Sequence, residues 1–427
     1  MIELRHVGFR VILRGREIAA PAGGTARRSR RPPPRRAPRD ETGVNTRTAP
    51  PRIVFISHSA RLGGAELCLV ELAEGLVKLF GAAVEVVLPA PGPLGEHLTA
   101  VGARARVVRN FGWATARAPR PVGVALAAFN AVAALRLAAM LRHRRPDVVA
   151  TNSVINPAGA YAAHLAGVPH IWLVNEYGDL DHGYRFLLGI ARSLREVDRL
   201  SARVVTCSRA LARRVSEYVQ ADKVEVAYYA VTFGLGREPS PAPGRPGAPK
   251  LLILGRKHPG KGQLDAVLAL QRVRQRGGAA TLRVVGEAQG RHAHELVRLC
   301  AGMGPDCGVT FVPRVPDAVA EIDACDVLLL CSRCEAFGRV VVEAMKRGRP
   351  VIAARAGGAE ELVMDSGGGL LYPPGDDAAL ADAIERLGSN PSEARRMGAA
   401  GRAWAERNCT MERYARAFLD VVEQVRG

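Results

Sequence analysis

The sequence predicts an α/β protein with two doubly wound parallel sheets that face each other across a cleft. Three observations indicate this fold class. The chain has 427 residues, more than a single core usually organises. From residue 51 onward, short apolar runs alternate with helix-like segments, which is typical of parallel sheets covered by helices. This alternation stops at a Pro- and Gly-rich stretch, residues 237–249, and then starts again.

These observations divide the chain into four parts. Residues 1–50 contain twelve Arg against four acidic residues, with three consecutive prolines, so we expect a disordered basic tail. Residues 51–236 are expected to form the first domain, 237–249 a linker, and 250–427 the second domain. We leave open whether the last helix packs back on the first domain.

In the first domain, each short apolar run is expected to form a buried strand. The strands are expected at 52–56, 84–88, 106–108, 146–150, 170–174 and 204–206, and the helices at about 64–80, 122–142, 158–166, up to 200, and 209–218. Gly63 and Gly64 lie in the turn before the first helix. Such a turn is typical of anion-binding loops, because the free N–H groups of a helix start point into it. A tight turn that merely needs glycine explains the pair equally well.

The second domain repeats the pattern. Strands are expected at 251–254, 281–285, 309–311, 327–330 and 351–353, and helices at 263–276, 292–301, 315–324 and 339–347; residues 367–372 and further helices complete the chain. The strand at 327–330 leads into Glu335, and the helix that follows holds Glu343 and stops at Gly348.

The charge and cysteine content narrow the function classes. The formal net charge is +19, of which the tail supplies 12 − 4 = +8 and the remainder +11. A basic excess favours nucleic acid, an anionic membrane or a phosphorylated substrate as partner. Aromatic residues are few and the charge is densest in the tail, so a specific nucleic-acid partner is not expected. Eight cysteines without a regular framework indicate reduced thiols in a cytosolic protein.

No targeting or membrane-spanning segment is expected. The first twenty residues lack an apolar core of signal-peptide length. Residues 122–141 are apolar but contain Asn130 and Arg136, and basic residues follow at once, which indicates a buried or interfacial helix. The basic surface would suit salt-sensitive peripheral association with an anionic cytoplasmic leaflet.

The loop 255–262 carries two cations next to a helix start. Its sequence, GRKHPGKG, is close to a P-loop, but Gly262 stands where that motif needs Ser or Thr to hold Mg²⁺. What remains is a glycine-rich loop after a strand, with Arg256 as a planar fork and Lys261 as a mobile point charge. The pair fits a diphosphate; the alternative is a solvated basic loop.

Glu335 and Glu343 are separated by seven residues at a strand–loop–helix junction. Ligands of α/β proteins bind at such carboxyl ends of strands. We expect the second carboxylate two turns along the helix, about 12 Å from the first, which suits a long polar ligand. Carboxylates accept hydrogen bonds from vicinal hydroxyls. Beside a diphosphate loop, they describe a sugar-nucleotide pocket. Alternatively, Glu343 pairs with Arg339 and Arg347 on the helix surface, and Glu335 is a carboxylate favoured by the helix dipole.

These motifs carry a resemblance to a known family. Glu335 and Glu343 within SRCEAFGRVVVEAMKRGRPVIAARAGGAEELV, together with GRKHPGKG and GGAE, make residues 51–427 similar to the retaining glycosyltransferases of group 1, which have the GT-B fold of two Rossmann-like domains. The resemblance implies that Glu343 binds the donor ribose and Glu335 the donor sugar. It also implies that the amides of Ala336, Phe337 and Gly338 contact the sugar, that Arg256 and Lys261 bind the diphosphate, and that Gly63 and Gly64 lie beside it.

The sequence departs from the family on the acceptor side. Many members have His-Gly after the strand at 170–174, whereas this chain has Asn175 and Glu176. The group that meets the acceptor is therefore open, and the candidates by location are Asn175, Glu176, Asp179, Asp181 and His182.

The resemblance implies a hexosyltransferase-type enzyme that moves a sugar from a UDP- or GDP-sugar to a carbohydrate or lipid-linked glycan, with retention, without a metal or other cofactor. The first domain would bind the acceptor and the second the donor, at the cytoplasmic face of a membrane and in polysaccharide biosynthesis. Two alternatives stay open. One is a nucleotide-sugar epimerase or phosphorylase of the same architecture. The other is a non-catalytic sugar-nucleotide-binding partner of a membrane enzyme.

Overall fold

The computed structural model describes residues 49–115, 120–232, 234–236, 247–287, 290–304 and 306–426. The predicted tail, residues 1–50, lies outside this range except for its last two residues. Most of the predicted linker, 237–249, lies outside it as well.

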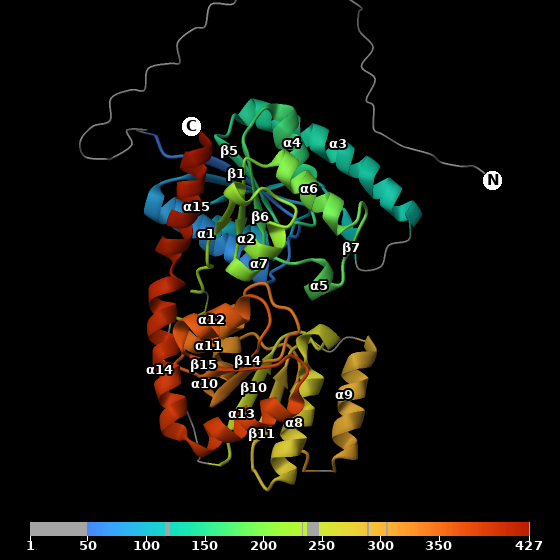
Figure 1. Ribbon diagram of the computed structural model, residues 1–427. Helices are drawn as coiled ribbons and strands as arrows, with labels where there is room; N and C mark the ends of the chain where they lie inside the picture. The colour runs from blue at the N-terminus through green and yellow to red at the C-terminus, as the bar shows by residue number, and fades with distance from the viewer. Residues whose placement is uncertain are drawn as a thin grey trace, which may run out of the picture. The chain divides into compact units, whose positions relative to one another are not determined.

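The first sheet has seven parallel strands in the order β3-β2-β1-β5-β6-β8-β9 (Figure 1). The strands are β1 (Arg52–Ser57), β2 (Ala83–Leu88), β3 (Arg104–Val107), β5 (Val148–Asn152), β6 (His170–Val174), β8 (Arg203–Thr206) and β9 (Val224–Val226). The strand order reverses between β1 and β5, because β2 and β3 follow on one side and β5, β6 and β8 on the other. In doubly wound sheets the ligand lies at this reversal, beyond the carboxyl ends of the strands.

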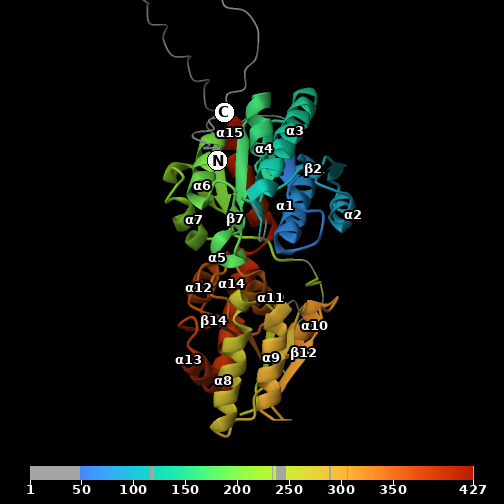
Figure 2. The same ribbon diagram turned by 90° about the vertical axis from the view of Figure 1, so that its right-hand side faces the viewer.

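The helices of this half connect its strands. They are α1 (Gly64–Phe80), α2 (Pro93–Ala100), α3 (Arg120–Arg144), α4 (Ala158–Ala166), α5 (Asp179–His182), α6 (Ile190–Leu200) and α7 (Arg209–Val215). α3 lies on the outside of the sheet against α4 (Figure 2). No helix in the described ranges combines the length and apolar character needed to cross a membrane.

The second sheet has six parallel strands in the order β12-β11-β10-β13-β14-β15. The strands are β10 (Lys250–Leu254), β11 (Thr281–Val285), β12 (Val309–Val312), β13 (Val327–Leu330), β14 (Val351–Ala354) and β15 (Gly369–Tyr372). The helices are α8 (Gln263–Gln275), α9 (Gly290–Gly302), α10 (Ala318–Asp323), α11 (Arg339–Lys346), α12 (Gly358–Ser366), α13 (Asp377–Ser389) and α14 (Pro391–Asn408). The order reverses between β10 and β13. The predicted fold class, two α/β domains with parallel sheets, is confirmed.

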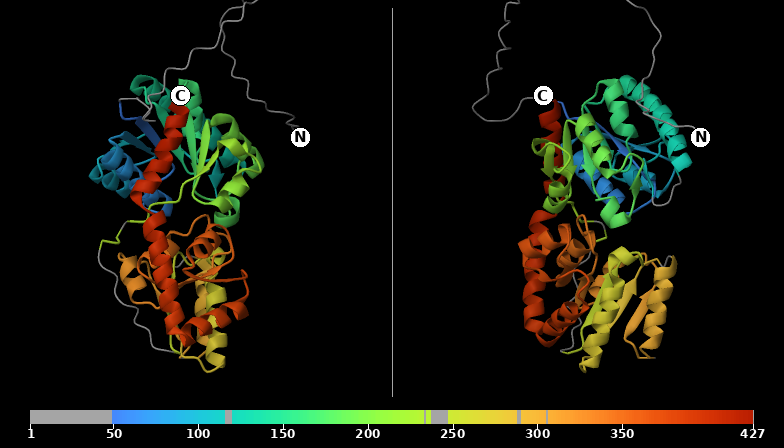
Figure 3. Two further views of the ribbon diagram at one scale, coloured as in Figure 1. Left: turned by 60° about the vertical axis from the view of Figure 1, so that its left-hand side comes forward. Right: turned by 45° about the vertical axis from the view of Figure 1, so that its right-hand side comes forward.

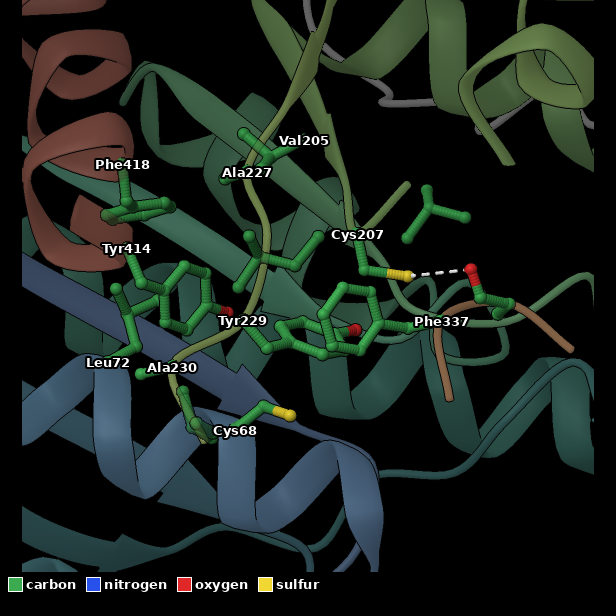
Figure 4. Close-up of a cluster of buried hydrophobic side chains, with 14 of the residues drawn as sticks. Cys68, Leu72, Val205, Cys207, Ala227, Tyr229, Ala230, Phe337, Tyr414 and Phe418 are labelled. Atoms are coloured by element: carbon green, nitrogen blue, oxygen red, sulfur yellow. Dashed lines mark hydrogen bonds between the residues drawn. The ribbon is translucent and has the colours of Figure 1, made fainter. Parts of the chain in front are cut away.

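The last helix, α15 (Met411–Arg426), returns to the first sheet (Figure 3). It packs along α1, and its Phe418 ring lies 5.4 Å from the ring of Phe55 in β1. One hydrophobic cluster joins residues of both halves, including Tyr229, Phe337 and Tyr414 (Figure 4). Residues from Ala49 onward accordingly form one compact unit.

Candidate functional site

The two motif loops leave neighbouring strands at the point where the second sheet reverses its order. The basic loop follows β10 and the Glu335 loop follows β13, which is hydrogen-bonded to β10. The two loops pack closely, since a Cβ added to Gly262 would lie 2.0 Å from the carbonyl oxygen of Cys331. Gly262 also has a φ of +65°, a region that favours glycine. The loop sequence therefore requires glycine here for packing, where a P-loop would place a metal-binding hydroxyl.

The two lysines of the basic loop have different roles. Lys257 is buried, and its Nζ donates to the carbonyl oxygens of Gly286 and Val312, the latter at 3.0 Å. Lys261 instead places its Nζ 2.8 Å from Oε2 of Glu335 and keeps 31% of its side chain exposed. Arg256 is exposed beside it. Arg256 and Lys261 are thus the cations that a ligand can reach, and Lys257 holds the loop in place.

The motif carboxylates do not share a helix. α11 begins at Arg339, four residues after Glu335, so Glu343 lies about one turn inside the helix, roughly 6 Å from its start. The prediction of two helical turns between the carboxylates is wrong, because Gly338 has a φ of +96° and keeps residues 335–338 outside the helix.

Glu343 lies beside a buried arginine. Arg339 Nε is 3.7 Å from Glu343 Oε1, and Arg339 Nη1 is 2.5 Å from Oε2 of Glu71 in α1. Burial raises the pKa of Glu343, and the charge of Arg339 opposes that shift. The Arg339–Glu343 pair exists as the alternative reading expected, but it is not on the surface. Arg339 is an interior cation that joins α11 to α1.

The residues between the two carboxylates offer backbone donors. Ala336 and Phe337 are buried, and the Phe337 ring lies 4.9 Å from the ring of Tyr229. The thiol of Cys207 donates to the carbonyl of Ala336 at 3.6 Å, as Figure 4 shows. Within the described ranges, no protein acceptor lies within reach of the N–H groups of Ala336, Phe337 and Gly338. They precede a helix start, an arrangement that suits an oxygen-rich ligand.

The Gly63–Gly64 turn of the first sheet lies beside the start of α11. It lies between β1 and α1, at the reversal of that sheet. A Cβ added to Gly64 would be 3.7 Å from Cδ of Arg339, so the turn lies beside the start of α11. The Gly63 N–H donates to Oε2 of Glu66 at 3.2 Å, so this N–H already has a partner inside the turn.

Two of the acceptor-side candidates are held inside the first domain. The amide of Asn175 donates to Oδ1 of Asn152 at 2.6 Å and accepts from the hydroxyl of Tyr229 at 2.8 Å. Glu176 is buried and accepts from the Ser153 hydroxyl and, at 2.8 Å, from the Val154 N–H. Burial raises the pKa of Glu176 to about 8. These contacts give both residues a positioning role.

The other three candidates lie in α5, which faces the basic loop. A Cβ added to Gly260 would be 3.9 Å from the carbonyl oxygen of Asp181. The Asp181 carboxylate accepts from two backbone N–H groups of its own turn, and Asp179 lies 3.6 Å from Arg214. His182 stacks on Tyr184 and keeps 32% of its side chain exposed.

His182 is therefore the candidate that the structure brings toward the basic loop. Burial lowers its pKa, the Asp181 carboxylate opposes that shift, and the charges of Lys261 and Arg256 add to it. A neutral imidazole beside these cations can accept a hydrogen bond through one ring nitrogen and donate through the other.

Sequence reasoning missed three residues at the reversal of the first sheet. His58 Nε2 lies 3.2 Å from Oε1 of Glu66, and His58 directly follows β1. Asn152 ends β5, is 2% exposed, and its Nδ2 has no partner within the described residues. The sequence did contain a signal for them, since polar residues follow or end two strands of the predicted sheet. The sequence analysis used this region only to predict the glycine turn.

A hollow of about 610 Å³ lies next to the basic loop in the second domain. Its lining residues are Lys257, Glu287, Ala293, Val297, Phe311, Val312, Pro313 and Arg314. The lining combines an aromatic and several aliphatic side chains with charged groups, which suits one flat, partly polar ligand group.

Comparison with known proteins decides the family. Residues 238–404 match the family described as glycosyl transferases group 1, and residues 63–230 match the family described as glycosyl transferase 4-like domain. The chain belongs to the group 1 glycosyltransferases. The resemblance predicted from Glu335, Glu343 and the two glycine-containing loops is confirmed at the level of the family.

Curated relatives of this glycosyltransferase chain carry several names. It is 30% identical over 260 residues to a D-inositol 3-phosphate glycosyltransferase of Segniliparus rotundus, covering 58% of this chain and 57% of the relative. It is 28% identical over 277 residues to a glycogen synthase of Mycobacterium tuberculosis, covering 61% and 64%. The aligned part thus spans less than two thirds of these relatives.

Solved structures of similar fold align over nearly the whole chain. Anabaena Alr3699/HepE in complex with UDP aligns with a TM-score of 0.71 at 23% identity, over 87% of this chain and 100% of that one. Sucrose-phosphate synthase from Thermosynechococcus elongatus aligns with a TM-score of 0.68 at 20% identity, over 88% and 98%. At these identities the likeness establishes the GT-B fold of this glycosyltransferase family member.

Proposed function

We propose that this protein is a retaining glycosyltransferase that moves a sugar from a UDP- or GDP-sugar to a carbohydrate or lipid-linked glycan. The observation that carries the proposal is the convergence of Arg256, Lys261 and Glu335 from two neighbouring strand ends, with Lys261 Nζ 2.8 Å from Glu335 Oε2. Two cations and a carboxylate at one point suit a diphosphate attached to a polyhydroxylated ring.

In this proposal the donor is held along its length. Arg256 and Lys261 bind the diphosphate and stabilise the charge that develops on it as the sugar leaves, so the reaction needs no metal ion. Glu335 and the free N–H groups of Ala336–Gly338 bind the sugar. Glu343, whose charge Arg339 favours, accepts hydrogen bonds from the ribose.

The acceptor approaches from the first domain. His182 faces the basic loop, and we assign it to the acceptor side. Asn175 and Glu176 hold the strand end in position behind it. The names of similar structures support a nucleotide-sugar donor, since Anabaena HepE was solved with UDP-glucose. We place the protein in the cytoplasm, in polysaccharide biosynthesis, with a peripheral contact to an anionic membrane.

Calorimetric titration with UDP- and GDP-sugars tests the donor site. Lys261→Ala removes a charged hydrogen-bond donor, and we expect about ten- to hundredfold weaker binding. Glu343→Ala is expected to weaken binding by roughly tenfold. Lys78 and Glu74, an ion pair in α1, provide matched controls: Lys78→Ala and Glu74→Ala should bind like the wild type. Unchanged affinity in folded Lys261→Ala and Glu343→Ala would remove both residues from the donor site.

A second measurement separates transfer from the alternatives. The donor is mixed with candidate glycans, and release of free nucleoside diphosphate is followed. Release that depends on the acceptor supports a transferase. Conversion of the donor without an acceptor identifies an epimerase, release dependent only on phosphate or diphosphate identifies a phosphorylase, and binding without turnover identifies a non-catalytic binder; each of these contradicts the proposal.

A further inference from the structure

The outer face of α3 exposes a row of large apolar side chains. Phe129 is 61% exposed, Val132 48% and Leu135 61%, and they recur at every third position of the helix. Phe111, 42% exposed, extends the row, because its ring lies 5.8 Å from the ring of Phe129. We call these four residues the α3 apolar row. Contiguous exposed apolar groups of this size mark an interaction surface more often than single ones do.

The fold does not need these side chains outside the helix. The opposite face of α3 supplies the core, where Leu137, Ala138 and Leu141 are buried in a cluster with strands β1 and β5. α4 packs on that inner side, and Figures 1 and 2 show α3 at the outside of its domain. The α3 apolar row therefore faces solvent, while the helix is already anchored.

The charge along α3 has one sign. From Arg120 to Pro146 the sequence contains no Asp or Glu. The helix exposes Arg136, Arg142 and His143, and Arg145 is exposed directly after its end. Arg142 also fixes the helix to α4, since its Nη2 donates to the carbonyl of Leu165 at 2.5 Å. The row is thus continued by a basic end that is held in one orientation.

We propose that the α3 apolar row and its basic end dock this protein on the surface of an anionic lipid bilayer. Phenylalanine, valine and leucine side chains enter the boundary between headgroups and acyl chains, and the arginines stay at the level of the lipid phosphates. A second copy of the chain is a poorer occupant, because two such faces would bring like charges together. The proposal rests on the membrane contact of the proposed function and assigns a surface to it. It is independent of the donor site, so it can fail while the glycosyltransferase assignment holds.

Flotation with vesicles tests this surface in the full chain. The vesicles contain phosphatidylcholine with phosphatidylserine, or phosphatidylcholine alone. We expect the wild type to float with the anionic vesicles, and Phe129→Ser/Leu135→Ser to partition at least about tenfold less, since two exposed apolar side chains are lost. Leu79→Ser/Val297→Ser is the matched control: these residues are 51% and 52% exposed on α1 and α9, and the double variant should float like the wild type. The basic tail is the same in all of them.

A fluorescence measurement reports insertion directly. The native Trp113, Trp172 and Trp404 are buried, so Val132→Trp adds an exposed indole on the row. Brominated lipids in anionic vesicles should quench Val132→Trp strongly, and should leave the wild type and Leu79→Trp nearly unchanged.

Two results would overturn the proposal. One is equal flotation of wild type and Phe129→Ser/Leu135→Ser together with no extra quenching of Val132→Trp. The other is sedimentation that shows a wild-type dimer lost in Phe129→Ser/Leu135→Ser while vesicle binding stays the same. The second result would assign the row to a contact between copies of the chain.

Discussion

Burial raises the pKa of two carboxyl groups of this protein, Glu343 and Glu176, but their surroundings differ. Glu343 has a cation beside it, Arg339, which opposes the effect of burial on its pKa. Glu176 has neutral donors, the Ser153 hydroxyl and the Val154 N–H, and its pKa rises to about 8. The net pKa of Glu343 is still raised, but Arg339 gives its carboxylate a charged partner that Glu176 lacks among the described residues. Glu176 holds a proton near neutral pH and serves to fix the end of β5.

The raised pKa of Glu176 predicts a pH-dependent stability. The folded value, about 8, lies above the ordinary value of 4.5, so the stabilising effect of the bound proton is present at low pH and lost as pH rises toward 8. In Glu176→Gln this loss is absent. Between pH 6.5 and 8 we expect the wild type to lose about 1–2 kcal/mol of unfolding free energy relative to Glu176→Gln.

Urea unfolding of both proteins across that range measures the effect. The range begins at 6.5 because burial also lowers the pKa of His170 to about 3, and that group costs stability as pH falls below its ordinary value. Parallel stability curves for wild type and Glu176→Gln from pH 6.5 to 8 would show that Glu176 is ionised in the folded protein.

The sequence predicted the roles of individual residues where a motif carries them. It could not predict roles that depend on contacts between residues far apart in sequence. Arg256, Lys261 and Glu335 could be grouped by their chemistry, because two cations and a carboxylate on loops that follow strands suit a sugar nucleotide. The structure adds that these two strands, β10 and β13, are neighbours. The buried, structural role of Lys257 could not be predicted, because the carbonyls that bind it come from Gly286 and Val312, far away in sequence.

At the scale of elements, the basic loop and the Glu335 loop depend on each other for their shape. Gly262 and Gly277 both have positive φ, +65° and +87°. A Cβ on Gly262 would meet the Cys331 carbonyl at 2.0 Å, whereas one on Gly277 would have nothing within 4 Å. Both glycines therefore share the backbone conformation, but only Gly262 is also crowded by a neighbouring loop.

The pair predicts unequal effects of one substitution. Gly277→Ala should cost about 1 kcal/mol of stability, the backbone term alone. Gly262→Ala should cost more than about 3 kcal/mol, because the two loops must move apart. Urea midpoints measure both, and we also expect weaker sugar-nucleotide binding for Gly262→Ala. Equal midpoints for the two variants would show that the loops can separate freely.

Apolar, buried elements could be predicted from the sequence, whereas very short elements and two helices could not. Apolar runs located β6 and α4 with the observed bounds, because a buried strand or helix must be apolar. β9, and the two-stranded sheet of β4 (Ala114–Thr115) and β7 (Arg185–Phe186), were missed, since two or three residues carry no periodicity. α2 was missed as well. α12 was missed because it starts within a glycine pair that indicates a turn, and Gly358 there packs against the Ala336 carbonyl.

At the scale of the whole molecule, the last helix packs on the first sheet. α15 comes after the second sheet in sequence, yet Tyr414 packs 5.5 Å from the ring of Tyr229 and Phe418 5.4 Å from that of Phe55. Between the two sheets, Glu361 of α12 accepts from the backbone N–H groups of Arg209 and Ala210 at the start of α7. The two halves therefore share apolar and polar contacts, and the core of the first sheet includes residues that follow the second sheet in sequence.

This sharing predicts that damage at α15 is felt in both sheets. Phe418 is fully buried, and Phe418→Ala should lower the free energy of unfolding by about 3–5 kcal/mol through the cavity it leaves. Phe129→Ala, the same substitution at a side chain 61% exposed, should change it by less than about 0.5 kcal/mol. Hydrogen exchange followed by mass spectrometry then locates the loss. Peptides from β6 and from α11 should lose protection together, because the cluster around Tyr229 and Phe337 joins them. Loss confined to the first sheet, with α11 protected as in the wild type, would show that the two domains unfold independently despite their common core.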